Sequence, residues 1–155
     1  MTIASLYVHR PVLNGADIVR WARAMGFSQT LAPDDIHITI AYSREPMEWP
    51  APHIDHLTIY PMSPRRVEPL GDEGAVVLHL GEVPILEQRW RALRAHGASW
   101  DYDGYQPHVT ISYEGGDADL AHVIPFMGAI LLGPEVFAEV NEEFAPGEIS
   151  ATPAA

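Results

Sequence analysis

The sequence contains no cysteine and no lysine, so all nine of its basic side chains are arginine. The absence of cysteine excludes disulfides, zinc–thiolate sites and thiol nucleophiles. With 21 acidic residues, the formal net charge at pH 7 is −12. Proteins that bind long DNA or RNA neutralise its phosphates with clustered Lys and Arg, so we expect no long nucleic acid as a partner. A small anionic molecule held in a pocket needs only local complementarity and tolerates this charge.

From the sequence we also expect no segment that targets or anchors the protein. No apolar run approaches the roughly 20 residues of a membrane-spanning helix, and MTIASLYVHR does not have the pattern of a signal peptide. We therefore expect a cytoplasmic protein without a membrane partner. There is no P-loop, no G-x-S-x-G elbow and no dinucleotide fingerprint, and His53 and His56 do not form an H-E-x-x-H pair. These absences predict no cofactor and no metal site.

What the chain does contain is two near-copies of one hexapeptide, HITIAY at 37–42 and HVTISY at 108–113. Both are β-branched runs typical of strands, in which side chains two residues apart share a face. His37 therefore lies beside Thr39, and His108 beside Thr110. A single His-x-Thr carries little information, but two copies 71 residues apart predict a shared site. Two histidines on either side of a phosphate can act as general base and general acid.

The two motifs fall in halves of similar order. Each half has strands, one amphipathic helix and one motif strand, which predicts duplicated halves around a central cleft. No flexible linker separates them, so we expect one domain of residues 1–145 with two lobes and a frayed tail at 146–155. The expected strands are 5–9, 36–42, 56–60, 66–70, 75–80, 108–113, 130–132 and 135–141, and the expected helices run from an Asn14 cap to Gly26 and from Pro84 to Gly97.

The paired His-x-Thr motifs resemble the two-histidine (2H) phosphoesterase superfamily, which includes RNA cyclic phosphodiesterases and 2′,5′ RNA ligase-like proteins. The resemblance implies an α+β, bilobal fold: two pseudo-symmetric halves of antiparallel sheet, with helices packed outside and a central cleft. It also implies a metal-independent reaction in which His37 and His108 transfer protons while Thr39 and Thr110 donate hydrogen bonds to the phosphate. Which histidine is the base stays open.

A narrower resemblance is carried by SLYVHRPVLNGADIVRWARAMGF, DDIHITIAYS, GYQPHVTISY and ILLGPEVFAEV. These stretches look like the small phosphodiesterases with which bacteriophages degrade the cyclic nucleotide signals of CBASS immunity. This implies a cyclic di- or trinucleotide as the small-molecule substrate, and the host cytoplasm as the location if a phage encodes the chain.

Further substrate-binding residues are suggested by strand parity. In PEVFAEVN, Val136, Ala138 and Val140 share one face, and if that face is core, Glu139 and Asn141 face the cleft. Tyr7 lies on the first strand, where a phenol ring can stack on a base. For Tyr7, Glu139 and Asn141, a structural role is as plausible as substrate binding. Counting five residues from His37 and His108 places Tyr42 and Tyr113 on the opposite, packing face.

Three other functions fit the same residues. One is a 2H enzyme of RNA ends, acting on 2′,3′-cyclic or 2′,5′ linkages. Another is a module that sequesters a nucleotide without cleaving it. The third is a structural role, if the domain is fused to a virion protein. The acidic charge favours a cyclic nucleotide over RNA, and the two intact His-x-Thr pairs favour an enzyme. The sequence does not predict the oligomeric state.

Overall fold

The structure, a computed structural model, describes residues 1–115 and 118–141 and has an α+β fold. The predicted frayed tail, residues 146–155, lies outside the described residues. In chain order the elements are β1 (Ile3–Pro11), α1 (Gly15–Ala24), the 3₁₀ turn η1 (Pro33–Asp35), β2 (His37–Glu48), β3 (Leu57–Ile59), β4 (Arg66–Leu70), β5 (Ala75–His79), α2 (Pro84–His96), β6 (His108–Ser112), the 3₁₀ turn η2 (Leu120–His122), β7 (Ile130–Leu132) and β8 (Val136–Ala138).

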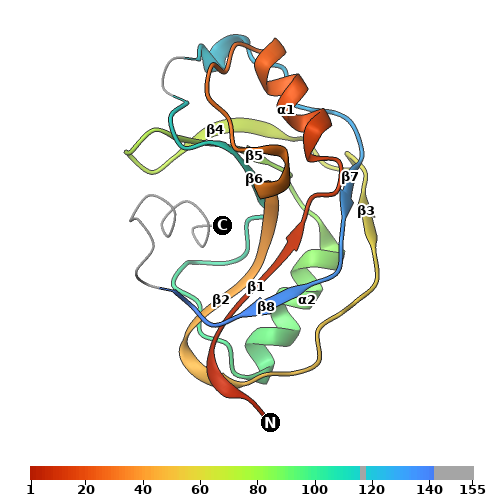
Figure 1. Cartoon of the computed structure of the whole chain (residues 1–155), viewed down its shortest axis with the longest axis vertical. Coiled ribbons are helices and arrows are strands. Elements are labelled where there is room, and N and C mark those ends of the chain that lie inside the picture. Colours follow the sequence, from red (N-terminus) through yellow and green to blue (C-terminus); the bar gives the residue numbers. More distant parts are fainter. Residues whose placement is uncertain (116–117, 142–155) are drawn as a thin grey trace.

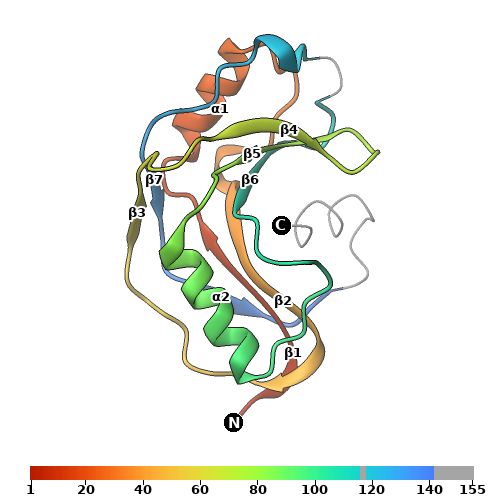
Figure 2. The same cartoon turned by 180° about the vertical axis from the view of Figure 1, so that it is seen from behind.

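The described strands form three antiparallel sheets, ordered β2-β1-β8, β4-β5-β6 and β3-β7. Each three-stranded sheet contains one of the motif strands, β2 or β6. Figure 1 shows the sheet of β2 curving along the lower part of the molecule and the sheet of β6 across its upper part. The reverse view in Figure 2 shows the same arrangement of the two sheets.

The internal repeat predicted from the motif order is present as two strand–helix–strand units, β1–α1–β2 and β5–α2–β6. The helices are exchanged between the units: α2 packs against β2, and α1 against β6. Figures 1 and 2 show α1 beside the upper sheet and α2 behind the lower one. Because each motif strand is covered by the helix of the other unit, neither unit buries its own apolar sheet face alone.

The first helix owes its position to one apolar stripe. Ile18 and Ala22 are buried, and Gly26 follows the helix at φ 104°, a conformation that favours glycine. Asn14 occupies the predicted cap position, but its side chain does not cap the helix. Instead its amide donates to the Ala129 carbonyl at 2.8 Å and accepts from the Leu131 N–H at 3.0 Å. The Asn14 side chain therefore binds the backbone at β7 instead of capping α1.

The second helix follows its sequence signals closely. Pro84 lies in the first turn, where its missing N–H costs no hydrogen bond, and Gly97 ends the helix at φ 126°. Leu86, Trp90 and Leu93 form the buried stripe. Neither described helix is long and apolar enough to cross a membrane.

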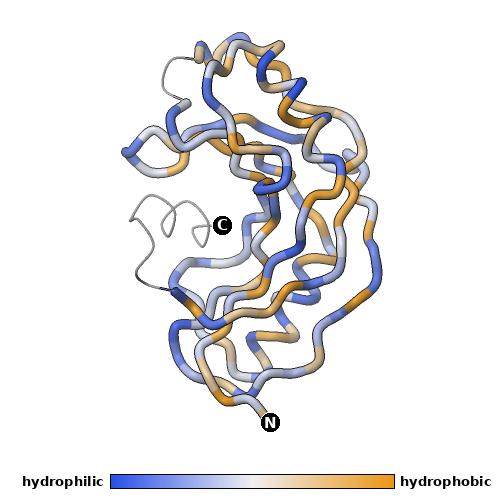
Figure 3. The backbone as a smooth tube through the Cα atoms, in the orientation of Figure 1, coloured by the Kyte–Doolittle hydropathy of each residue, from blue (hydrophilic) through white to orange (hydrophobic). Residues whose placement is uncertain are grey.

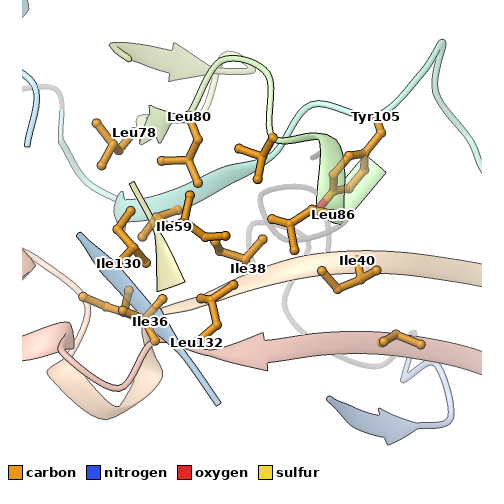
Figure 4. Close-up of a cluster of buried hydrophobic side chains, with 14 of the residues drawn as sticks. Ile36, Ile38, Ile40, Ile59, Leu78, Leu80, Leu86, Tyr105, Ile130 and Leu132 are labelled. Carbon is orange, nitrogen blue, oxygen red and sulfur yellow. The ribbon is translucent and has the colours of Figure 1, made fainter. Parts of the chain in front are cut away.

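A single cluster of buried apolar side chains joins the sheets and helices. Figure 4 shows Ile38 and Ile40 of β2 meeting Leu86 of α2, with Leu132 of β7 close by and Leu78 of β5 at the far side of the cluster. The hydropathy of the chain follows this arrangement: in Figure 3 orange and blue segments alternate along α1, as expected for a helix with one buried face. Burying residues far apart in sequence, such as Ile38 and Leu132, fixes how the sheets meet.

Several strands differ from their predicted extent, and β2 and β8 differ in ways that bear on the site. Strand β2 continues beyond its predicted end at residue 42 to Glu48, through Pro46. Strand β8 is shorter than predicted and its faces are reversed: Val136 is 42% exposed, whereas Phe137 packs against the core and meets Trp49 edge-on at 6.0 Å. The expectation that Val136 and Ala138 form the core face is therefore wrong. The larger ring of Phe137 buries more apolar area than the smaller side chains do, which decides the orientation.

Candidate functional site

The first His-x-Thr pair lies on the face of β2 opposite the core. Ile38 is fully buried and points into the apolar cluster of Figure 4, so His37 and Thr39 lie on the other face. In the second motif Val109 is likewise fully buried between His108 and Thr110. Thr39, His108 and Thr110 are themselves almost enclosed, and His37 is half-buried. Both pairs thus have the strand geometry that the sequence predicts.

A β-bulge follows each motif at the same position. Between the pairs Val8–Ala41 and His9–Thr39, strand β2 carries the extra residue Ile40. Strand β6 carries an extra residue, Ile111, between the positions that pair with Val76 and Val77. A bulge inserts one residue and so reverses the parity of the strand beyond it. The pseudo-symmetry of the two halves extends to this detail.

The bulge corrects one sequence expectation. Beyond Ile40 the alternation is reversed, so Tyr42 pairs with Tyr7 and lies on the face of His37 and Thr39. The rings of Tyr7 and Tyr42 meet edge-on at 5.7 Å. Counting residues from His37 assumed an unbroken strand and therefore placed Tyr42 on the wrong face.

Both motif histidines bind a backbone carbonyl two residues earlier. Nδ1 of His37 lies 2.7 Å from the Asp35 carbonyl oxygen, and Nδ1 of His108 lies 3.0 Å from that of Gln106. A carbonyl only accepts, so each Nδ1 is the protonated nitrogen. This fixes the neutral tautomer with its lone pair on Nε2, the form that can accept a proton.

The turn that presents the Asp35 carbonyl is held by a close approach. A Cβ on Gly15, at the start of α1, would collide with the backbone oxygen of Pro33 in η1. Only glycine lets the helix start lie this close to the turn. The orientation of His37 thus depends on a contact between α1 and the residues just before β2.

Two hydrogen bonds, one at each motif strand, join that strand to the segment that precedes the other motif. The Leu31 N–H donates to the Ile111 carbonyl at 2.9 Å, and the Tyr105 hydroxyl donates to the Thr39 carbonyl at 2.7 Å. Tyr105 is buried and stacks on Trp90 with ring centroids 5.7 Å apart. These bonds, together with the direct packing of β2 on β6, bring the two motif strands together. Sequence patterns gave no sign that Tyr105 has this role.

Aromatic rings line the site face of β1. Tyr7 and His9 are stacked with centroids 5.0 Å apart, and the Tyr7 hydroxyl lies 3.3 Å from Oγ1 of Thr39. Burial chiefly, and to a smaller extent the nearby Tyr113 of the second hexapeptide, raise the pKa of the Tyr7 phenol. The structure therefore brings Tyr7 to the first His-x-Thr pair. The alternation of β1 could have drawn attention to His9, because it lies two residues after Tyr7 and so shares its face.

The imidazoles of this face are disfavoured in their charged form. Burial lowers the pKa of His37 below its usual 6.5, and the hydrogen bond to Asp35 opposes that shift only in part. Burial and, second, the neighbouring His37 lower the pKa of His9 to about 4. His79, whose backbone pairs with that of His108, also has a lowered pKa, chiefly because it is buried. Neutral imidazoles are thus available for proton transfer near pH 7.

These shifts predict how stability depends on pH. When the chain unfolds between pH 6.5 and 4, His9 gains a proton that it does not carry in the folded state, so stability falls as the pH falls through this range. We expect His9→Gln to lose less stability than the wild type from pH 7 to pH 4.5, by on the order of 2 kcal/mol. Urea unfolding at both pH values measures the difference. Equal losses in the two proteins would contradict the assigned shift.

The other two proposed binding residues follow the end of β8. Glu139 and Asn141 are both exposed, and the Val140 N–H between them donates to the Ser5 hydroxyl at 3.0 Å. Their predicted orientation rested on Val136 and Ala138 facing the core, which the structure contradicts. Within residues 1–115 and 118–141, no three His, Cys, Asp or Glu side chains are grouped closely enough to share a metal ion.

A model of the family described as anti-CBASS protein Acb1 matches residues 4–147. The chain belongs to this family. It is 49% identical over 146 residues to an anti-CBASS protein Acb1 of Caulobacter sp. (strain RHG1), and 46% identical over 149 residues to one of Sphingomonas paeninsulae. These matches cover 90% and 91% of the chain but 23% and 24% of the relatives, so the chain spans about a quarter of their length.

Two solved structures share this fold. The chain aligns with Escherichia coli LigT complexed with phosphate at a TM-score of 0.57 and 18% identity, covering 95% of this chain and 92% of LigT. Another is a protein described as a phosphoesterase, with a TM-score of 0.59 and 17% identity. The fold predicted from the two motifs, an α+β 2H phosphoesterase fold with antiparallel sheets, is confirmed.

Proposed function

We propose that the chain is a metal-independent phosphodiesterase that hydrolyses 3′–5′ linkages of cyclic di- or trinucleotide immune signals, such as cyclic GMP-AMP. The observation that carries this proposal is the pair of His-x-Thr motifs, each with its histidine held through Nδ1 on a carbonyl. Membership of the anti-CBASS family supports the substrate class. Such an enzyme would act in the cytoplasm of the infected host.

The residues supply the steps of such a reaction without a cofactor. One imidazole Nε2, of His37 or His108, takes the proton of the attacking 2′-hydroxyl or water as its oxygen bonds to phosphorus. The other imidazole, in protonated form, gives its proton to the leaving oxygen as the old P–O bond breaks. Attack by the 2′-hydroxyl gives a 2′,3′-cyclic phosphate, and attack by water a 3′-phosphate. Thr39 and Thr110 would donate to the non-bridging oxygens, where negative charge accumulates.

The charge of the chain supports a small substrate. A cyclic dinucleotide carries two phosphates, which a few donors can hold despite a net charge of −12. Base stacking, worth about 1–3 kcal/mol per base, would supply further affinity. Tyr7 is our first candidate for this stacking, because it lies on the face of His37 and Thr39. Glu139 and Asn141 are not, since Val136 and Ala138 pair with His9 and Tyr7 and so occupy that face of β8 in their place. Burial raises the pKa of the Tyr7 phenol above 10, so this ring stays uncharged beside an anionic ligand.

The RNA-end reaction is the competing function, because the resemblance of the paired His-x-Thr motifs to the 2H superfamily implies it as well. A direct comparison separates the two: turnover of 3′,3′-cyclic GMP-AMP, a cyclic trinucleotide, an RNA with a 2′,3′-cyclic end and a tRNA, in excess EDTA at low and moderate salt. We expect cyclic nucleotides to be cleaved fastest, with EDTA having no effect and salt a weak one, because few phosphates are bound. Faster cleavage of either RNA would assign the chain to RNA ends. Loss of activity in EDTA that Mg²⁺, Mn²⁺ or Zn²⁺ restores would contradict the metal-independent mechanism.

A further inference from the structure

His9 is placed among the motif residues without belonging to a motif. Its backbone pairs with that of Thr39, and its ring lies edge-on to that of His37 with centroids 5.4 Å apart. On its other side the ring stacks on Tyr7, at an interplanar angle of 24°. Val8 and Arg10, its neighbours along β1, are buried on the core side. The alternation of the strand therefore directs His9 to the face of His37 and Thr39.

The two nitrogens of the His9 ring have different surroundings. Nδ1 is fully enclosed and has no hydrogen-bond partner among the described residues. Nε2 is not such an enclosed, unpartnered atom. An enclosed N–H without a partner is rarer and more costly than an enclosed acceptor without one. The neutral ring therefore carries its proton on Nε2 rather than on the enclosed Nδ1. The lowered pKa of His9, which burial and then the neighbouring His37 cause, agrees with a neutral ring.

We propose that His9 is a third hydrogen-bond donor of this site, whose Nε2–H binds an anionic oxygen of the phosphate held between the two motifs. The proposal rests on the phosphodiesterase function and adds a residue to it. Oγ1 of Thr39 lies 3.3 Å from the Tyr7 hydroxyl oxygen, so these two hydroxyls can bind each other. A second donor beside Thr39 would then add to the hydrogen bonds that the first motif gives the phosphate. A neutral donor suits this position because it can bind an anion without adding a second positive charge beside His37 when His37 is protonated.

Two substitutions separate donation from packing. His9→Phe keeps an aromatic ring to stack on Tyr7 but has no N–H, whereas His9→Gln keeps a side-chain N–H and loses the ring. His56→Phe is the matched control, because His56 is exposed and lies outside the site. Circular dichroism and thermal melting of each variant confirm that the fold is retained before any comparison.

Binding of inorganic phosphate is the readout that does not depend on turnover. In ¹H–¹⁵N spectra of the histidine side chains, we expect phosphate to shift the Nε2 signal of His9. We expect His9→Phe to weaken phosphate binding about tenfold or more, since hydrogen bonds to charged groups contribute more than neutral ones. His9→Gln should retain most of the affinity, and His56→Phe all of it. No shift at His9, or equal weakening in His9→Phe and His9→Gln, would overturn the proposal.

Turnover of 3′,3′-cyclic GMP-AMP then tests whether the donor acts in the transition state. We expect His9→Phe to lower kcat by about 10²-fold, as for loss of a single oxyanion donor, with a smaller change in KM. Wild-type kcat in His9→Phe would overturn the role of His9 and leave the proposed function intact. If phosphate binding depends on His9 but the wild type cleaves no cyclic nucleotide, the donor is supported and the proposed substrate is wrong.

Discussion

His37→Ala and His108→Ala should each reduce phosphodiester cleavage by about 10²–10⁴-fold, because each removes one of the two groups that transfer protons. The double variant should be little worse than the more impaired single variant, since base and acid act as one unit. Initial rates with 3′,3′-cyclic GMP-AMP, or whichever substrate the comparison above identifies, measure the effect.

The matched control for these variants is His56→Ala, which removes an exposed histidine outside the motifs. We expect His56→Ala to keep the wild-type rate, and all of these variants to keep the wild-type circular dichroism spectrum. A folded His37→Ala or His108→Ala variant with near-wild-type activity would rule out the two-histidine mechanism.

The largest effect on stability should come from the ion pair of Arg89 and Glu135. Arg89 donates from Nε and Nη2 to the two oxygens of the Glu135 carboxylate, both at 2.9 Å, and the Glu135 side chain is fully buried. The same carboxylate accepts from the His53 N–H at 2.8 Å. Arg89→Ala would leave a buried negative charge with one remaining donor. We expect the free energy of unfolding to fall by about 3–5 kcal/mol, which guanidinium unfolding measures.

Two further variants test the cause of this loss. Arg91→Ala removes a neighbouring ion pair, with Glu87 at 3.4 Å, whose side chains are both exposed, so it should cost less than about 1 kcal/mol. The double variant Arg89→Met, Glu135→Leu removes both charges and should recover much of the stability lost in Arg89→Ala. If Arg89→Ala lowers the free energy of unfolding no more than Arg91→Ala does, the pair of Arg89 and Glu135 does not stabilise the fold as predicted.

Local patterns in the sequence were sufficient for the helices and most of the strands. The stripes of Ile18 and Ala22 in α1, and of Leu86 and Leu93 in α2, lie on the core side as their spacing predicts. Capping was less predictable, because Asn14 has hydrogen-bonding groups that any nearby chain can use. In the folded protein those groups bind the backbone at Ala129 and Leu131, which lie more than 110 residues away.

Strand β8 shows where a local rule fails. Among the described strands it pairs only with β1, and its orientation depends on which of its side chains packs against the rest of the protein. Phe137 packs against Trp49, so Val136 is exposed, although Val136 and Ala138 form the more uniformly apolar face of the strand. Alternation along one strand gives two candidate faces, and only the neighbouring elements decide between them.

The sequence by itself determined the two His-x-Thr pairs, because the side chains of His37 and Thr39 share a face wherever the strand is regular. The tertiary structure alone decided what surrounds them. The bulge at Ile40 brings Tyr42 to the site face, the pairing of β1 with β2 sets His9 beside Thr39, and folding brings Tyr105 to the Thr39 carbonyl. Each of these depends on register or contact between distant segments, whereas the motif depends only on a period of two residues.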